Sequence, residues 1–393
     1  MAPSRCSWPL INDNITNEDK LAMISFISTP NVRFTNGDNV RQFEKAWSDW
    51  EGVKNTTYVN SGASANYIMM SVVKELKGCG EVIVPPLGWV SDISPVVNLG
   101  MKPVFVDIDP KTLCIGFDNI LKATNENTVA IVLVHALGFN GMDQRIVDFA
   151  KEKGIMLIED CCEAHGATYN GQRVGTFGDM SNFSFYFGHH ITTIEGGTVC
   201  TNDDTIHEYI RLFRSHGMTR ESSQEFQDKY QQKYPHLNPL FTFAVPGYNM
   251  RNTEINAVLG IEQMKRIDYN IERRRHNLAL WNSSLDSSKF YTEYNLEGNS
   301  SFALPLVLIE PDKEIFKNIC NLLEDELVEY RVGTAGGGNQ TLQPYMVEGK
   351  YDYSVIGDLT YTNHIHYYSL YVGNHPELTD EQILDLCERL NNV

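Results

Sequence analysis

The sequence lacks the features that mark several protein classes. None of its apolar runs reaches the roughly 18 residues that a membrane-spanning helix needs. Basic residues are outnumbered, because 32 lysines and arginines stand against 50 acidic residues, for a formal net charge of −18. A nucleic-acid-binding surface needs a basic face. We therefore expect neither a membrane nor a nucleic acid as a partner, although a pocket for an anionic substrate can still be locally positive.

Grouped cysteines are missing as well. The eight cysteines form no C-x-x-C pair, and the vicinal Cys161 and Cys162 are poorly placed to bridge each other. We interpret them as free, buried thiols. An iron–sulfur cluster needs several clustered thiolates, so this spacing argues against one, and we predict no metal site. Residues 1–6 lack the apolar core of a secretory signal, which favours a cytoplasmic location.

What is present indicates an α/β enzyme. A chain of 393 residues with 42% hydrophobic content can build two domains. Its first two thirds alternate short apolar runs with helical patterns, which predicts βαβ units and a mostly parallel sheet. The runs are almost continuously apolar, as in strands covered on both faces. We expect strands at 58–60, 81–84, 103–107, 130–134 and 155–160, and a further pair at 184–187 and 197–201.

The rest of the chain indicates a second, smaller unit. We predict a large domain over residues 1–275, including the N-terminal segment, and a small C-terminal α+β domain over 276–393. His364 and His366 alternate along an expected strand, where no other ligand supports a metal. The other expectations are an irregular stretch at 222–239 and helices at 253–275, 313–330 and 379–391, the last opened by a capping box.

Small residues at 60–66 form a candidate phosphate loop. The segment follows an expected strand and opens a helix, so its backbone N–H groups and the helix dipole can hold a phosphate. Gly62 lets the chain turn tightly and Ser64 adds a hydroxyl. Such turns often serve packing only, and alone this one is a weak signal.

Asp160 ends an expected strand, where parallel sheets place their ligands. A carboxylate there can keep a pyridine nitrogen protonated, so that the ring accepts electrons. The competing interpretation, an Asp that caps the following helix, is about equally common. Trp89 could stack on a flat ring, or belong to the core or an interface. Asn249 and Arg251 could bind a phosphate or carboxylate, or lie in a solvated loop.

These elements, together with FSFYFGHHITTIEGG at 183–197, stand in an order that resembles the DegT/DnrJ/EryC1/StrS family of sugar aminotransferases. The resemblance runs from about residue 34 to 373. It implies the aspartate-aminotransferase fold (fold type I) and the cofactor pyridoxal 5'-phosphate or pyridoxamine 5'-phosphate. It also implies a homodimer with shared active sites, because Asn249 would reach the phosphate of the neighbouring subunit's cofactor.

The family's motifs also assign roles to the matching residues of this chain. The resemblance implies that Trp89 stacks on the cofactor ring, that Asp160 pairs with its nitrogen and that Glu163 orients an amine or water. Arg251 and Arg331 would clamp the carboxylates of L-glutamate. The residues implied at the phosphate are Gly62, Ala63, Ser64 and Ser184.

His189 departs from the family, which carries at this position the lysine that holds the cofactor covalently. An imidazole cannot form that bond, but it titrates near neutral pH and can move a proton. With His190 beside it, the segment resembles the sugar 3-dehydratase branch, above all enzymes acting on GDP-4-keto-6-deoxy-D-mannose. The implied reaction removes the C3 hydroxyl of a nucleotide-linked 4-keto-6-deoxy sugar for 3,6-dideoxysugar and O-antigen synthesis. His189 would be its acid–base, and glutamate would regenerate the aminated cofactor.

Two other functions stay open at this point. One is a nucleotide-sugar 4-aminotransferase that has lost covalent tethering, and the other is a non-catalytic relative that binds cofactor or sugar. The nucleotide is also open, since GDP is inferred from the resemblance and CDP, dTDP and UDP remain possible. We interpret His165 and His190 as structural.

Overall fold

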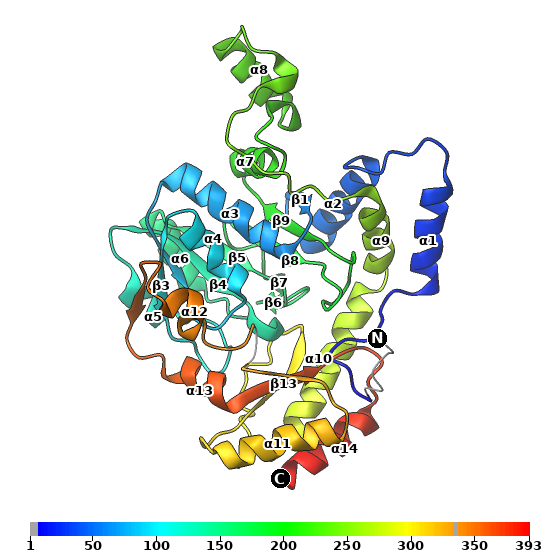
Figure 1. The fold of residues 1–393 in the computed structure, drawn as a ribbon, viewed down its shortest axis with the longest axis vertical. Helices are drawn as coiled ribbons and strands as arrows, with labels where there is room; N and C mark the ends of the chain where they lie inside the picture. Colours follow the sequence, from blue (N-terminus) through cyan, green and yellow to red (C-terminus); the bar gives the residue numbers. More distant parts are fainter. Residues whose placement is uncertain (1–6, 334–335) are drawn as a thin grey trace.

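A twisted sheet of eight strands forms the centre of the computed structural model, which describes residues 7–333 and 336–393 (Figure 1). Neighbouring strands are parallel except where β9 pairs with β1 and β8. In spatial order the strands are β1 (Asn55–Val59), β9 (Gly197–Thr201), β8 (Met180–Ser184), β5 (Met156–Asp160), β4 (Thr128–Val134), β2 (Glu81–Val84), β3 (Lys102–Val106) and β12 (Ser354–Ile356).

The large sheet confirms the expected α/β class, with one strand placed wrongly. Strands β2 and β9 have the predicted bounds, and β1, β3, β4 and β5 overlap theirs. The strand expected at 184–187 is instead β8, which ends at Ser184. The error arose because β8 carries polar residues in the interior: Ser181 Oγ donates to the Gly175 carbonyl, and Asn182 lies fully buried beside Asp160. A hydrophobicity pattern cannot register buried polar groups that are satisfied by hydrogen bonds.

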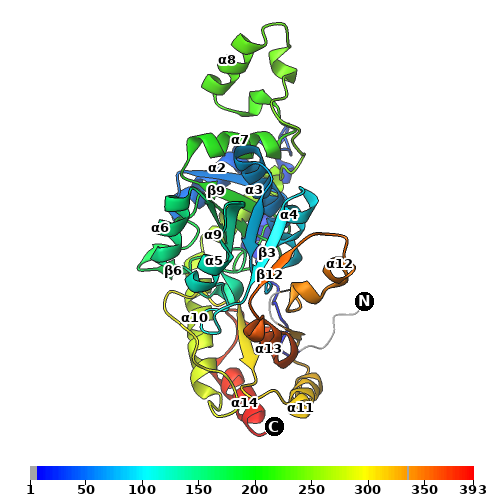
Figure 2. The same ribbon diagram turned by 90° about the vertical axis from the view of Figure 1, so that its left-hand side faces the viewer.

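Helices flank the large sheet on both sides (Figures 1 and 2). Helix α3 packs along β8 and β9, and α2 packs on β1 and α9. The helices of this part are α1 (Asn17–Ser28), α2 (Asp38–Glu51), α3 (Gly62–Lys77), α4 (Ser94–Asn98), α5 (Phe117–Ala123), α6 (Gln144–Lys153), α7 (Asp204–Arg214) and α9 (Glu254–Met264), with short 3₁₀ turns η1 (Val90–Asp92) and η2 (Ala136–Gly138).

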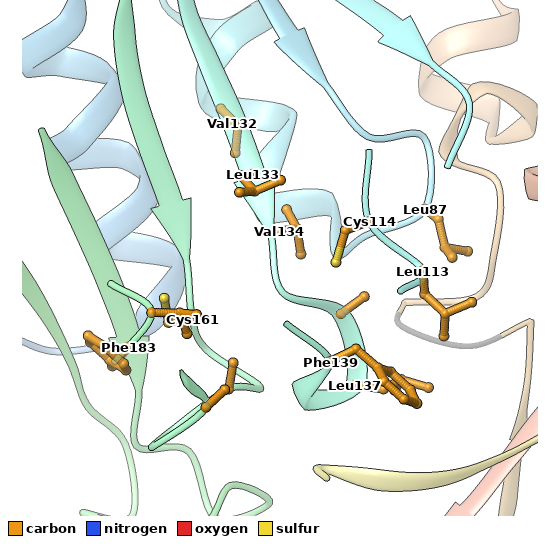
Figure 3. Close-up of a cluster of buried hydrophobic side chains, with 14 of the residues drawn as sticks. Leu87, Leu113, Cys114, Val132, Leu133, Val134, Leu137, Phe139, Cys161 and Phe183 are labelled. Carbon is orange, nitrogen blue, oxygen red and sulfur yellow. The ribbon is translucent and has the colours of Figure 1, made fainter. Parts of the chain in front are cut away.

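The core lies between these layers, and part of it reaches the carboxyl ends of β4 and β5 (Figure 3). Val132, Leu133 and Val134 follow one another along β4 toward the loop that carries the buried Leu137 and Phe139. Fully burying one such side chain stabilises the fold by about 1.5–3 kcal/mol. The loops at this edge of the sheet are therefore anchored by apolar packing.

Residues 215–245 project from the body as an arm (Figure 1). The expectation of an irregular stretch at 222–239 is wrong, because α8 (Gln224–Lys233) forms there between η3 (Thr219–Glu221) and η4 (Pro239–Phe241). Ser223 caps α8 by accepting a hydrogen bond from the Phe226 amide at 3.3 Å. No residue of α8 is buried, so no apolar periodicity announced the helix.

A single helix over 253–275 is also corrected, since α9 is followed by a separate α10 (Ile267–Ser284). The break lies at Arg266, whose φ of −125° and ψ of 7° are not helical. The Arg266 guanidinium donates instead to Asp19 on α1 and to the Asn14 carbonyl. Helix α10 runs through the expected division at 275/276, and β12 joins the large sheet from beyond it, so that division stays a prediction.

The C-terminal part contains a three-stranded antiparallel sheet in the order β10 (Ala303–Val307), β13 (Ser369–Gly373), β11 (Tyr330–Val332). Trp8 packs here and donates from its indole nitrogen to the Gly373 carbonyl at 2.9 Å. The remaining elements are α11 (Lys313–Asp325), α12 (Pro344–Val347), α13 (Thr360–Tyr368), α14 (Asp380–Asn391), η5 (Gln340–Leu342) and the hairpin β6 (Thr168–Tyr169) and β7 (Gln172–Arg173).

Two expectations for this part are wrong and one is confirmed. His364 and His366 lie in helix α13, not in a strand, and His364 Nε2 donates to the Leu308 carbonyl. Helix α11 ends at Asp325, five residues before the expected Tyr330, which belongs to β11. The capping box at Thr379 is present. Within the described residues, no helix combines the length and apolar character needed to cross a membrane.

Candidate active site

The N-terminus of α3 meets the end of β8 at the carboxyl edge of the large sheet. A Cβ atom on Gly62 would lie 2.7 Å from the Ser184 Cβ and 2.9 Å from the Cys162 Sγ, so only glycine allows this approach. Ser61 caps the helix by accepting a hydrogen bond from the Ser64 amide at 3.0 Å. Gly62 and Ala63, as the first helical residues, have amides without an intrahelical acceptor. The predicted phosphate residues therefore come together around free amides, as an anion site requires.

Asp160 ends β5 in the same region and is almost fully buried. Its Oδ2 accepts hydrogen bonds from the side-chain amides of Asn66 at 2.7 Å and Asn182 at 3.2 Å. Its Oδ1 accepts from the Cys162 amide at 2.9 Å, which is the local turn that the capping interpretation anticipated. Side-chain hydrogen bonds from α3 and β8 go beyond a local cap, so the carboxylate is held firmly at the strand end.

Asp92, in η1, lies close to Asp160, and the sequence did not identify it as a site residue. Asn66 bridges the two by donating to Asp92 Oδ1 at 3.1 Å. Burial, and then the neighbouring Asp160, raises the pKa of Asp92 well above its usual range. Two carboxyl groups in one buried site disfavour double ionisation, so the protonated form of Asp92 is favoured.

Trp89 immediately precedes η1 and stays 56% exposed, which is unusual for a tryptophan in a well-packed edge. A Cβ atom on Gly336 would lie 3.1 Å from the Trp89 Cε3, so the backbone after residue 335 packs against the indole. Much of the ring nevertheless stays open to a ligand. Its stacking role stays a prediction.

His189 lies in the loop between β8 and β9, and its ring is half-buried. The Nδ1 atom is buried without a hydrogen-bond partner, whereas Nε2 is not among the buried unpaired atoms and is the open ring nitrogen. Burial, and secondarily the charge of Arg274, lowers the pKa of His189 to about 3, while Asp160 acts in the opposite direction. The ring is therefore neutral at physiological pH, as a general base must be.

The loop that carries His189 packs against the N-terminal segment and is contacted by Phe302 and Arg274. A Cβ atom on Gly188 would lie 2.6 Å from the Ile11 Cδ1, so the N-terminal segment packs directly against the loop. The Phe302 ring contacts the His189 ring with centroids 5.3 Å apart. Arg274 on α10 donates to the carbonyls of Phe302 at 2.8 Å and His189 at 3.5 Å.

Glu163 follows β5 and accepts a hydrogen bond from the Leu137 amide at 2.7 Å. Leu137, labelled in Figure 3, has a φ of 53°, a left-handed conformation that is strained for a leucine. Burial raises the pKa of Glu163 to about 7; the Leu137 amide lowers it and Asp160 raises it further. Glu163 can thus hold or release a proton near neutral pH.

The small sheet adds Tyr371 to this edge. Its ring lies 6.5 Å from that of Phe302, and Arg331 stands opposite it in the β11–β13 register. Burial raises the pKa of Tyr371, with a further contribution from Glu163 and an opposing one from Arg331. Arg331 is exposed but lies close enough to Tyr371 to act on it electrostatically. Its expected role at a glutamate carboxylate stays a prediction.

Asn249 and Arg251 lie beside the end of β1. The backbone of Arg251 forms an isolated antiparallel β-bridge with that of Val59. The Met250 carbonyl accepts a hydrogen bond from the Asn60 amide at 3.0 Å. Asn249 is exposed, and its Oδ1 accepts from Arg251 Nε at 3.1 Å. The pair is therefore formed within the protomer, with Asn249 exposed and Arg251 half-buried.

One buried group of potential metal ligands, His135, Glu159 and Cys161, occurs in the described chain. The Glu159 carboxylate already accepts hydrogen bonds from the amides of Gly175 and Gly178 and lies 3.2 Å from His135 Nε2. The Gly141 amide donates to His135 Nδ1. These hydrogen bonds explain the cluster without an ion. The cysteines at 79, 114, 161, 162, 200, 320 and 387 are free, and Cys6 lies outside the described residues.

The loop between β8 and β9 that carries His189 contains no lysine. Over residues 7–333 and 336–393, all lysines are exposed except Lys102 and Lys289, which are half-buried. Lys102 pairs with Glu81 where β2 and β3 begin, at the opposite edge of the sheet, and Lys289 donates to the Asn391 carbonyl.

Comparison with known proteins identifies the scaffold. The model of the DegT/DnrJ/EryC1/StrS aminotransferase family matches residues 15–391. The chain belongs to this family. It is 34% identical over 383 residues to a GDP-4-keto-6-deoxy-D-mannose 3-dehydratase from Yersinia pseudotuberculosis, covering 96% of this chain and 95% of that protein.

Solved structures agree. The E. coli GDP-4-keto-6-deoxy-D-mannose-3-dehydratase with bound hydrated PLP aligns with a TM-score of 0.88 at 29% identity, covering 98% of this chain and 99% of that one. A GDP-4-keto-6-deoxymannose-3-dehydratase structure with a trapped PLP–glutamate geminal diamine aligns with a TM-score of 0.87 at 29% identity, covering 98% and 100%. The predicted family and fold type are confirmed.

Proposed function

We propose that this family member is a 3-dehydratase for a nucleotide-linked 4-keto-6-deoxy sugar, with GDP-4-keto-6-deoxy-D-mannose as substrate. The observation that carries the proposal is His189: a neutral imidazole with an open Nε2 stands in a β8–β9 loop that contains no lysine. The named relatives are 3-dehydratases of this sugar over nearly the full chain.

The residues present fit pyridoxal or pyridoxamine 5'-phosphate. The amides of Gly62 and Ala63, with Ser64 and Ser184 beside them, would hold the phosphate at the α3 N-terminus. Asp160 would hold the ring nitrogen, and Trp89 offers an exposed indole for stacking. When bound, the cofactor supplies an amine and a conjugated ring that accepts electrons.

His189 Nε2 would take a proton from the reacting carbon and return one to the departing C3 hydroxyl, which leaves as water. Glu163, with a pKa near 7, would hold or move a proton beside it. Arg251 and Arg331 would bind the carboxylates of L-glutamate, the amino donor. Overall, the sugar exchanges its C3 hydroxyl for hydrogen while glutamate becomes 2-oxoglutarate and ammonia, so atoms and electrons balance.

A homodimer with shared sites is part of the proposal. The arm carries three apolar side chains that are more than half exposed, Leu240, Phe241 and Phe243. Exposed apolar patches of this kind mark interaction surfaces. Mixing two inactive variants, His189→Asn and Asn249→Ala, should restore part of the activity if Asn249 serves the partner's site. Failure to restore any activity in a confirmed mixed dimer contradicts sharing.

The family name keeps one alternative, a sugar 4-aminotransferase. Incubation with a panel of 4-keto-6-deoxy nucleotide sugars (GDP, CDP, dTDP and UDP) and glutamate separates the two. The dehydratase releases ammonia and a product one oxygen atom lighter, whereas the aminotransferase leaves a stable amino sugar. His189→Asn is the matched control.

A further inference from the structure

Three histidines, His165, His189 and His190, lie together at the carboxyl edge of the large sheet. The ring centroids of His165 and His190 are 5.1 Å apart, and those of His165 and His189 are 5.8 Å apart. His165, which follows β5, and His190 are both buried. Only His189 has an open ring nitrogen, so the other two can act on the reaction only through it.

A backbone carbonyl fixes the proton of His190. His190 Nε2 lies 2.9 Å from the Ser300 carbonyl, which can only accept, so Nε2 carries the hydrogen. Burial, and then the charge of Arg274, lowers the pKa of His190 well below its usual value, which keeps the ring neutral. A neutral imidazole has one donor and one acceptor, so His190 Nδ1 must be the acceptor.

The acceptor role of His190 Nδ1 also determines the tautomer of His165. Its Nδ1 lies 3.0 Å from His190 Nδ1, and because the latter accepts, His165 Nδ1 donates. His165 is also kept neutral, since burial, with His189 and Arg274, lowers its pKa well below the usual value. His165 Nε2 is therefore an unprotonated nitrogen, and it is buried without a hydrogen-bond partner.

The opposite proton order is disfavoured. A proton on His165 Nε2, directed at the Ser184 backbone, would turn His165 Nδ1 into an acceptor. His190 would then have to donate from both nitrogens and become an imidazolium. Burial and the nearby Arg274 guanidinium both oppose a second cation there.

The third ring of the group is that of His189. Its Nδ1 is buried without a partner, on a ring in edge contact with His165. No hydrogen bond joins His189 Nδ1 to His165 Nε2, because both atoms are buried without partners. Across the edge contact of the two rings, the lone pair of an unprotonated His165 Nε2 attracts an N–H electrostatically, which favours the His189 proton on Nδ1 and leaves the lone pair on the open Nε2. The backbone of the pair is fixed as well, because Asn270 and Arg274 donate to the carbonyls of His190 and His189.

We propose that His190 is a positioning residue that acts through His165 to keep the His189 proton on Nδ1, so that Nε2 is the base. The link to catalysis rests on the proposed function, but the proton order does not. In Ser-His-Asp catalytic triads, a third group likewise holds the catalytic histidine in one tautomer.

Nitrogen-15 NMR of the full-length chain, labelled at histidine, reads the proton order directly. We expect His190 protonated on Nε2, and His165 and His189 on Nδ1, all neutral at pH 7 with and without cofactor. Single histidine variants assign the signals. An imidazolium at His190, or a His165 proton on Nε2, overturns the proposal whether or not the enzyme turns over any sugar.

Variants add a kinetic test. His190→Phe removes both hydrogen bonds, while His190→Asn places an amide oxygen near the position of Nδ1 and can still accept from His165. We expect His190→Phe to mix the His189 tautomers and lower kcat by about 10–100-fold with little change in KM, and His190→Asn to recover most of it. The surface variant His276→Gln is the control, because His276 pairs only with Asp380 on the exterior.

The outcomes separate the two proposals. If the wild type gives no dehydration but the proton order is found, the proposed function fails and this inference stands. If dehydration proceeds while His190→Phe leaves the His189 tautomer and kcat unchanged, this inference fails alone. Should His190→Phe not fold, the wild-type spectrum and His190→Asn still decide.

Discussion

The side-chain amide of Asn66 donates to both Asp160, at 2.7 Å, and Asp92, at 3.1 Å. One residue on α3 thus ties the carboxylate at the end of β5 to a second buried carboxyl group, whose pKa is raised well above its usual range by burial and by Asp160. The roles of the two aspartates can therefore be tested separately by mutating each one.

Asp160→Asn should lower kcat by about 100-fold or more, because the proposed ring-nitrogen contact loses its charge. Asp92→Asn is the matched control and should stay within about tenfold of the wild type, since burial and the neighbouring Asp160 raise the Asp92 pKa well above its usual range and favour its uncharged form. Steady-state kinetics with the absorption spectrum of the bound cofactor measures both. Equal losses in the two variants would contradict the assignment of the charge.

The free energy of unfolding of Glu163→Gln, measured relative to that of the wild type at the same pH, should be higher at pH 8 than at pH 5. Burial raises the Glu163 pKa to about 7, so its stabilising contribution is complete below the ordinary pKa of a glutamate and is lost as pH rises through 7. We expect a difference of about 1–3 kcal/mol between the two pH values in urea unfolding. A difference that does not change with pH would show that Glu163 does not titrate there.

His189 should not produce the fall in activity near pH 6.5 that an exposed histidine base gives. Burial lowers its pKa to about 3, so the base stays neutral at any pH above about 4. His189→Ala should lower kcat by about 10²–10⁴-fold. A pH–rate profile from pH 5 to 8 tests the first statement, and full activity in His189→Asn would refute the role itself.

Glu254 stabilises the start of α2 rather than the active site. Its carboxylate accepts from the amides of Gly37, Asn39 and Val40. Burial alone raises its pKa, but these hydrogen bonds together lower it, so the stabilisation is present above the ordinary glutamate pKa and is lost as pH falls through the lowered value. Glu254→Ala should cost about 1–3 kcal/mol at pH 7 and less in acid. The exposed Glu225→Ala is the control in the same urea unfolding series.

The sequence predicted the parts of the molecule that depend on apolar pattern and motif order. It identified the parallel strands, the family and the site segments that meet at one edge. It missed Asn66, Asn182 and Asp92, because contacts between side chains 22 to 94 residues apart leave no local signal. The contact between His190 and His165 likewise left no signal in the sequence, and a role of His190 beyond structure stays a proposal. The roles of individual cofactor-binding residues stay predictions.

The central claim is that His189 directs this scaffold to elimination. The most direct measurement is the product balance of the wild type with GDP-4-keto-6-deoxy-D-mannose, pyridoxal 5'-phosphate and L-glutamate. We predict equal amounts of ammonia, 2-oxoglutarate and a sugar one oxygen atom lighter, all lost in His189→Asn. A stable amino sugar formed in equal amount with 2-oxoglutarate, without ammonia, would contradict the claim.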